Sequence, residues 1–202
     1  MKVIIISVFI FASVSADQCR PRNYYWRPFN GSIPNDAFLA GTDLNGKKNY
    51  VAKIIPLDSY SWTVPELIKE DWAYIDFSWC CGGSSPLIRV DKAIEILCTE
   101  NQASLQWQEV EKHADELKPR CCLVEGGIGA TKGHIYIPYI GRVVQKGHNF
   151  IGRTYTDRSY KGLHIMNGTV SRQILKDYEV LTYHCDDNEV SLRNGEPESK
   201  SS

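Results

Sequence analysis

The chain has 202 residues, of which 43% are apolar, 23 are Lys or Arg and 24 are Asp or Glu. This apolar fraction excludes a wholly disordered chain and a collagen-like repeat. The net charge of −1 gives no electrostatic basis for nucleic acid or an anionic membrane as the main partner.

Residues 1–16 have the pattern of a secretory signal peptide. Lys2 precedes an apolar run that is too short to cross the roughly 30 Å core of a bilayer, and small residues end at Ala16. No later segment approaches the roughly 18 apolar residues of a membrane span. We therefore expect cleavage after Ala16 and a secreted, extracellular protein without a membrane span.

The mature chain is predicted to be mostly β. Turn signals and runs of β-branched and aromatic residues predict four strands, over residues 49–55, 94–97, 135–140 and 178–181. Two further segments, 65–71 and 104–117, are candidate helices, and the apolar residues of the second recur at roughly helical spacing. The polar residues 186–202 predict a disordered tail.

Blocks in the two halves of the chain align in the same order. Three pairs of blocks do so, at offsets of 85, 89 and 84: 32–37 with 117–122, 50–55 with 139–144, and 93–97 with 177–181. Trp26 precedes one copy and Trp107 the other. We predict a diverged duplication with halves at 17–104 and 105–185, which share a core because each half is small.

The ordered set Trp, Ile-Pro-x-x-Ala, Ala-Gly-x-Asp-x-x-Gly, Tyr-Val-Ala-Lys, Val-Pro and Ile-Glu-Ile-Leu resembles the DM-nine repeat family. The resemblance covers roughly Trp26–Leu97 and Trp107–Leu181. It implies an all-β fold in which two tandem repeats pack about a pseudo-twofold axis. It also implies carbohydrate binding, notably of mannose, and a role in innate recognition.

The resemblance places the sugar site at an Asp after Ala-Gly and a Lys about twenty residues later. Asp43 matches the Asp, whereas Leu67 occupies the Lys position. In the second half the Asp position falls near Ile128, and residues 151–154 replace the segment that holds the Lys.

Other polar residues can complete a sugar site around Asp43, because sugar hydroxyls need acceptors and donors together. Lys47, or Lys48 beside it, is a nearby donor, although Asp43 can instead cap the turn at Asn45-Gly46. Glu66 and Arg153 are assigned to corresponding places in the two halves. They are expected to form a solvated surface pair, with a mutual ion pair or a pocket lining as alternatives.

The seven cysteines face an oxidising compartment after secretion and are disulfide candidates. They are Cys19, Cys80, Cys81, Cys98, Cys121, Cys122 and Cys185. Adjacent cysteines do not readily bond to each other, so each should reach elsewhere, and Cys19 can join Cys185. The odd cysteine is left as a buried thiol or as an intermolecular bridge in a homodimer. Asn30 and Asn167 begin N-glycosylation sequons.

Motifs for an enzyme are not found. The histidines lack metal-ligand spacing, no Gly-x-Ser-x-Gly elbow occurs, and the glycines at 126–129 lack the context of a phosphate loop, so no metal or cofactor is expected. The first hypothesis is a secreted, lectin-like protein that binds carbohydrate or a microbial surface. The alternative is a secreted protein-interaction component, such as a salivary, venom or extracellular protein, that has lost sugar binding and recognises a protein partner.

Overall fold

The computed structural model describes residues 19–55, 62–78, 87–131, 134–157 and 160–185. The predicted signal peptide, residues 1–16, and the predicted tail, residues 186–202, lie outside the described residues. Cys80 and Cys81 also lie outside them.

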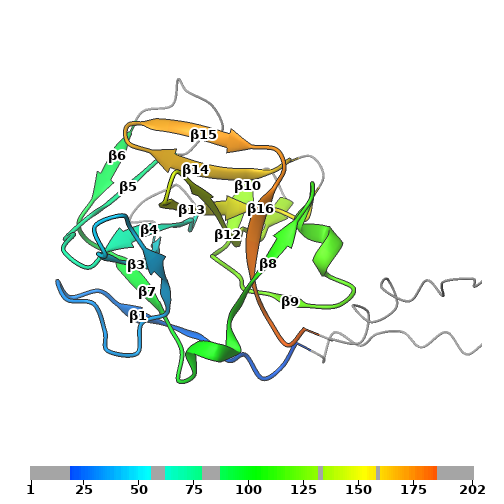
Figure 1. The fold of residues 1–202 in the computed structure, drawn as a ribbon, viewed down its shortest axis with the longest axis horizontal. Coiled ribbons are helices and arrows are strands. Elements are labelled where there is room, and N and C mark those ends of the chain that lie inside the picture. Colours follow the sequence, from blue (N-terminus) through cyan, green and yellow to red (C-terminus); the bar gives the residue numbers. More distant parts are fainter. Residues whose placement is uncertain (1–18, 56–61, 79–86, 132–133, 158–159, 186–202) are drawn as a thin grey trace, which may run out of the picture.

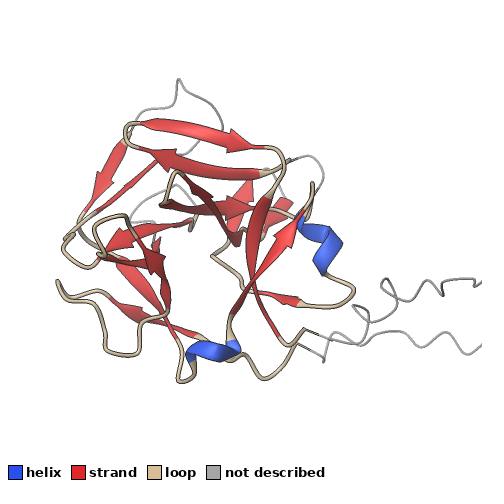
Figure 2. Cartoon of the chain, in the orientation of Figure 1, coloured by secondary structure: helices blue, strands red, loops and turns tan. Residues whose placement is uncertain are grey.

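The described chain is almost entirely β, as the sequence predicts (Figure 2). In the first half the strands are β1 (Tyr25–Pro28), β2 (Leu39–Thr42), β3 (Lys48–Ile54), β4 (Pro65–Lys69), β5 (Ile75–Phe77), β6 (Ile88–Val90) and β7 (Ile94–Cys98). In the second half they are β8 (Gln106–Val110), β9 (Cys122–Leu123), β10 (Gly129–Thr131), β11 (His134–Tyr136), β12 (Tyr139–Gln145), β13 (His148–Thr154), β14 (Leu163–Asn167), β15 (Val170–Ile174) and β16 (Tyr178–Tyr183). Two short 3₁₀ helices, η1 (Gln102–Ser104) and η2 (Ala114–Leu117), complete the described elements.

Each half contributes one main antiparallel sheet (Figure 1), and four strands of each sheet pair in the same order, β1-β7-β3-β4 in one and β8-β16-β12-β13 in the other. In the first half β1 pairs with β7, β7 with β3, and β3 with both β2 and β4. In the second half β8 pairs with β16, β16 with β12, and β12 with β13, and the sheet continues through β14 and β15. The four predicted strands correspond to β3, β7, β16 and the pair β11 and β12, which are interrupted at Pro138.

Both predicted helices are wrong. Residues 65–71 contain strand β4, which lies between β3 and β13, so its side chains are buried or half-buried on both faces and show no strict alternation. Residues 104–117 contain β8, whose pairing with β16 fixes it as a strand, and η2 follows as a single short turn. Tertiary pairing therefore overrides the local spacing of apolar residues in both segments.

The two sheets share one hydrophobic core, as expected for halves of this size. Alternate residues of the central strands face it, including Val51 on β3, Leu97 on β7, Ile140 on β12 and Leu181 on β16. Their neighbours along each strand point the other way, into a separate core on the far side of each sheet. Both sheets are thus covered on two faces.

Two disulfides join the two ends of the described chain to a pair of adjacent residues. Cys19 bonds to Cys122, and Cys185 bonds to Cys121, so this adjacent pair does reach elsewhere. A direct Cys19–Cys185 bond, which the sequence allowed, does not form. Cys98 is a free thiol, fully buried on β7, and burial raises its pKa to about 12, so that it stays protonated.

We predict that replacing both Cys121 and Cys185 with serine lowers the free energy of unfolding by roughly 2–4 kcal/mol, because the disulfide constrains the unfolded chain. The cross-link spans 64 residues. Urea denaturation measures the change, and Cys98→Ala is the control that leaves both bonds intact. Peptide mapping without reductant that finds Cys19 joined to Cys185 would contradict this pairing.

Candidate functional site

An ammonium group lies over an indole ring on the first sheet. Trp26 on β1 and Lys53 on β3 flank β7, and the Lys53 Nζ atom lies 4.3 Å from the centre of the Trp26 ring. The same Nζ atom lies 2.9 Å from a carboxylate oxygen of Glu95 on β7. The cation–π contact and the ion pair together fix the end of the lysine side chain.

The second sheet carries the same arrangement with arginine in place of lysine. The Arg142 guanidinium lies 4.4 Å from the centre of the Trp107 ring. Its Nε and Nη2 atoms donate to the two carboxylate oxygens of Glu179, at 2.6 and 2.8 Å. The sequence alignment pairs these residues with those of the first sheet, Lys53 with Arg142 and Glu95 with Glu179, and both acid–base pairs face each other across paired strands.

The two arrangements differ in what lies beyond the cation. Arg142 has a further donor, Nη1, which bonds the backbone carbonyl of Ala40 in the other half at 2.8 Å. At the alignment offset of 85, Ala40 corresponds to Glu125 in the second half. Glu125 and Lys53 both line a cavity of about 200 Å³. Its remaining walls are Arg22, Trp26, Thr63, Gly127 and Ile128. In one copy the arginine fork reaches a backbone carbonyl of the other half, whereas in the other copy the shorter lysine borders a cavity.

The cavity has both hydrogen-bond donors and an acceptor. The Arg22 Nη2 atom lies 2.8 Å from a carboxylate oxygen of Glu125, and both side chains are partly exposed. The Glu125 backbone N–H donates to the Tyr24 hydroxyl at 3.2 Å. Burial raises the pKa of Tyr24 to about 12, so this hydroxyl stays protonated. The acceptor in the cavity, Glu125, is thus held in place through its backbone and its side chain.

Gly127 allows the two halves to meet closely at this cavity. A Cβ atom at this position would lie 2.4 Å from the Thr63 carbonyl oxygen, nearer than any non-bonded contact permits. The Thr63 N–H donates to the Ile128 carbonyl at 2.8 Å, which joins the two walls of the cavity. A side chain at position 127 would therefore displace one wall.

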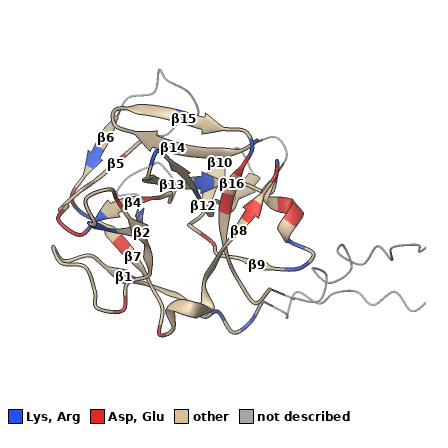
Figure 3. Ribbon diagram, viewed as in Figure 1, with Lys and Arg blue, Asp and Glu red and all other residues tan. Residues whose placement is uncertain are grey.

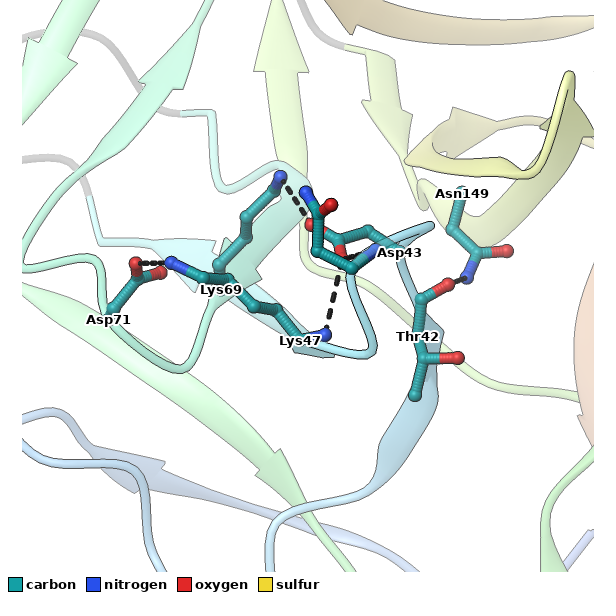
Figure 4. Close-up of polar contacts among 7 residues, drawn as sticks. Thr42, Asp43, Lys47, Lys69, Asp71 and Asn149 are labelled. Atoms are coloured by element: carbon teal, nitrogen blue, oxygen red, sulfur yellow. Dashed lines mark hydrogen bonds and ion pairs between the residues drawn. The ribbon is translucent and has the colours of Figure 1, made fainter.

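Asp43, the acceptor implied by the family resemblance, is engaged within its own loop (Figure 4). Its carboxylate accepts from the backbone N–H groups of Asn45 and Lys47, at 2.9 and 3.1 Å, and from the Lys69 Nζ atom at 3.1 Å. Burial opposes ionisation, but the hydrogen bonds from Lys69 and the two backbone groups lower its pKa below the usual value. Asp43 therefore caps the turn at Asn45-Gly46, which was the alternative to a sugar-binding role.

Two lysine side chains beside the Asp43 loop are already paired. Lys47 forms an ion pair with Asp71, and Lys69 reaches Asp43 from the end of β4 (Figure 4). Lys69 was not identified from the sequence, because it stands two residues beyond the position at which the family places its lysine. The strand period of two puts positions 67 and 69 on the same face of β4, and this was the available signal.

Asn149 joins the Asp43 loop to the second half of the chain. Its Nδ2 atom donates to the Thr42 carbonyl at 2.9 Å (Figure 4). Gly41 makes this contact possible, since a Cβ atom there would lie 2.3 Å from the same Nδ2 atom.

Glu66 and Arg153 form a buried ion pair between the halves, so the expected surface pair is wrong and their mutual pairing is correct. Arg153 Nη1 lies 3.6 Å from Glu66 Oε1, and both side chains are less than 5% exposed. Arg153 also donates to the Ser78 carbonyl at 3.0 Å. The strand register corrects the alignment of these two residues. Glu66 pairs with Ala52, and Gly141, which aligns with Ala52, pairs with Gly152. Glu66 therefore corresponds to Gly152, one residue before Arg153.

The charge of this buried cluster is set by its surroundings. Burial raises the pKa of Glu66 to about 8, although the neighbouring Arg153 charge acts in the opposite direction. Burial and the same Arg153 charge lower the pKa of His164 to about 4, and His164 lies opposite Arg153 on the neighbouring strand β14. Below pH 8 Glu66 is therefore largely protonated and Arg153 carries the charge of the cluster, which does not border the cavity beside Trp26.

Metal and membrane sites are not evident in the described part of the chain. No group of three or more His, Cys, Asp or Glu side chains among the described residues is arranged to hold a metal ion. None of the helices in the described ranges is long and apolar enough to cross a membrane.

The two predicted glycosylation sites lie at accessible turns. Asn30 is exposed in the loop after β1, and Asn167 is partly exposed where Gly168 turns the chain from β14 to β15.

In comparisons with known proteins, no protein-family model matches this chain and no curated protein matches it significantly.

We predict that stability falls as pH rises from 6.5 to 8, owing to Glu66. The unfolded Glu66 ionises near pH 4.5 and the folded one near pH 8, so the folded state binds more protons in this window. His164 acts in the opposite direction, but its contribution is complete above its unfolded pKa of 6.5.

The test compares Glu66→Gln with the wild type by chemical denaturation at pH 6.5 and pH 8. The wild type is expected to lose up to about 2 kcal/mol over this interval, and Glu66→Gln to lose much less. Glu111→Gln, at a side chain that is 76% exposed, is the matched control. An equal pH dependence in Glu66→Gln and the wild type would show that Glu66 keeps its ordinary pKa.

Proposed function

We propose that this protein is a secreted, lectin-like protein that binds a sugar in the cavity beside Trp26. The observation that carries the proposal is the difference between the two sheets. In the same Trp–cation–Glu arrangement, Arg142 bonds a backbone carbonyl of the other half on one sheet, whereas Lys53 borders a cavity of about 200 Å³ on the other.

The side chains around the cavity suit a polyhydroxylated ring. Trp26 lines the cavity, Glu125 accepts hydrogen bonds from hydroxyls, and Lys53 and Arg22 donate them. The volume is below the roughly 300–1,000 Å³ of sites for drug-sized ligands, which favours a single ring.

Charge favours a neutral sugar over an anionic one. Each cation at the cavity is already paired with a carboxylate, Arg22 with Glu125 and Lys53 with Glu95. Lys or Arg positions and Asp or Glu positions are interspersed along the ribbon in both halves (Figure 3). A ligand that exchanges hydrogen bonds with these pairs is therefore favoured over one that needs an unpaired cation.

The proposal extends to the cellular route and to the family. The leader-like residues 1–16 and the two disulfides support a secreted protein, since such bonds persist in oxidising compartments. Membership of the DM-nine repeat family, with its two related halves, is supported by the matching order of strand pairing. Mannose is the first sugar to test, but at Trp26 and Lys53 rather than at Asp43.

We predict that Lys53→Arg strongly weakens sugar binding, because an arginine can reach across the cavity as Arg142 reaches Ala40. Loss of the hydrogen bonds made by Lys53 and Glu125 should weaken affinity about ten-fold or more. A glycan array identifies the sugar, and titration calorimetry with its methyl glycoside measures the affinity. Trp26→Ala should weaken binding to a similar extent.

Two controls make this result specific. Arg142→Lys makes the converse exchange on the other sheet and should leave sugar affinity unchanged. Asp43→Ala removes the acceptor of the turn without touching the cavity and should also retain binding in folded protein. Unchanged affinity in Lys53→Arg together with loss in Asp43→Ala would move the site to the Asp43 loop. A folded protein that binds no glycan, but captures one saturable protein partner insensitive to free sugar, would replace the proposal with the protein-interaction alternative.

A further inference from the structure

An apolar hairpin stands beside the cavity. Strands β10 and β11 pair antiparallel, with Gly129 opposite Tyr136 and Ala130 opposite Ile135. Because side chains alternate along a strand, one face of the hairpin carries Ile128, Ala130, Ile135 and Ile137. These four residues are exposed, and the three isoleucines are 53%, 70% and 38% accessible in chain order. We call this set the isoleucine face.

The opposite face of the hairpin attaches it to the body of the protein. The Tyr136 ring stacks on the Trp62 ring with 5.6 Å between centroids, and Tyr160 meets the edge of Tyr136 at 5.0 Å. Gly129 lies beneath this stack, since a Cβ atom there would lie 2.3 Å from the Trp62 ring. The aromatic contacts therefore hold the hairpin in an orientation that leaves the isoleucine face uncovered.

The isoleucine face is continuous with the cavity. Ile128 both lines the cavity and begins this face. Residues 126–140 contain one charged side chain, that of Lys132, so polar attraction contributes little here. In the first half, the corresponding chain position is Asp43, which caps a polar turn instead of beginning an apolar hairpin.

An uncovered apolar surface that starts inside a polar cavity fits a ligand with two chemically different parts. We infer that the ligand is a glycolipid, whose sugar occupies the cavity and whose alkyl or acyl chain lies along the isoleucine face. This inference rests on the proposed sugar site and extends it from a single ring to a sugar with an apolar aglycone. Burial of the chain removes both its own apolar surface and that of the isoleucines from water.

The test measures affinity as a function of chain length. The probes are the methyl, hexyl and octyl glycosides of mannose, glucose and galactose, used below their critical micelle concentrations. Full burial of a methylene group tightens binding up to about four-fold, and contact with an open surface achieves part of this. We therefore expect the octyl glycoside of the preferred sugar to bind the wild type about ten-fold or more tightly than its methyl glycoside.

Ile135→Ser is the diagnostic variant, because its side chain is 70% exposed and lies outside the core clusters. It should bind methyl glycosides as the wild type does and lose most of the gain with chain length. Leu175→Ser removes a similarly exposed leucine, 59% accessible, that follows β15, and should retain the full gain.

The possible results separate the two proposals. Sugar-selective binding that does not vary with chain length, or a gain retained in Ile135→Ser, overturns the glycolipid inference and leaves the sugar site intact. Octyl glycosides that bind equally whatever their sugar overturn the sugar site and with it the glycolipid assignment. A wild-type dimer that Ile135→Ser converts to a monomer in light scattering would assign the isoleucine face to a second copy of the chain and overturn the inference.

Discussion

The apolar layer between the two sheets is the constraint on which the remaining structure depends. Val51, Leu97, Ile140 and Leu181 fill it from the central strands of both halves. Because strand side chains alternate, turning these residues inward sends their neighbours into a second core on the outer side of each sheet. Each sheet must therefore be covered on both of its faces. Burial of β4 against β13 follows from this arrangement, and so does the buried Glu66–Arg153 pair that joins them.

Strands with strong β-formers at their centres could be predicted from the sequence, because β3, β7, β12 and β16 carry their own signal in branched and aromatic side chains. The segments that failed lack such a signal. Strand β4 contains a glutamate and a proline, and it is a strand because β3 lies alongside it. Disulfide pairing could not be predicted either, since the closeness of Cys19 to Cys122 depends on how the first residues cross the second half.

The candidate site shows where sequence reasoning reaches its limit. The alignment of the halves matches Lys53 with Arg142, and a tryptophan, Trp26 or Trp107, precedes each copy. These residues could therefore be identified from the sequence. Their consequence could not, because the contact that distinguishes one copy joins Arg142 to a backbone carbonyl 102 residues away. The sugar site that the family resemblance implies at Asp43 could not be assessed from the sequence for a similar reason. Lys69 satisfies Asp43 from a neighbouring strand whose register no local pattern specifies.

The two disulfides share adjacent cysteines, and this has a mechanical consequence. A pull applied to the two ends of the described chain passes from Cys19 to Cys122, across one peptide bond to Cys121, and on to Cys185. The covalent path bypasses the intervening segments, which span 103 and 64 residues. Tension between the termini is therefore carried by covalent bonds and leaves the sheets unloaded. A protein held at both termini would therefore keep its fold under such a pull.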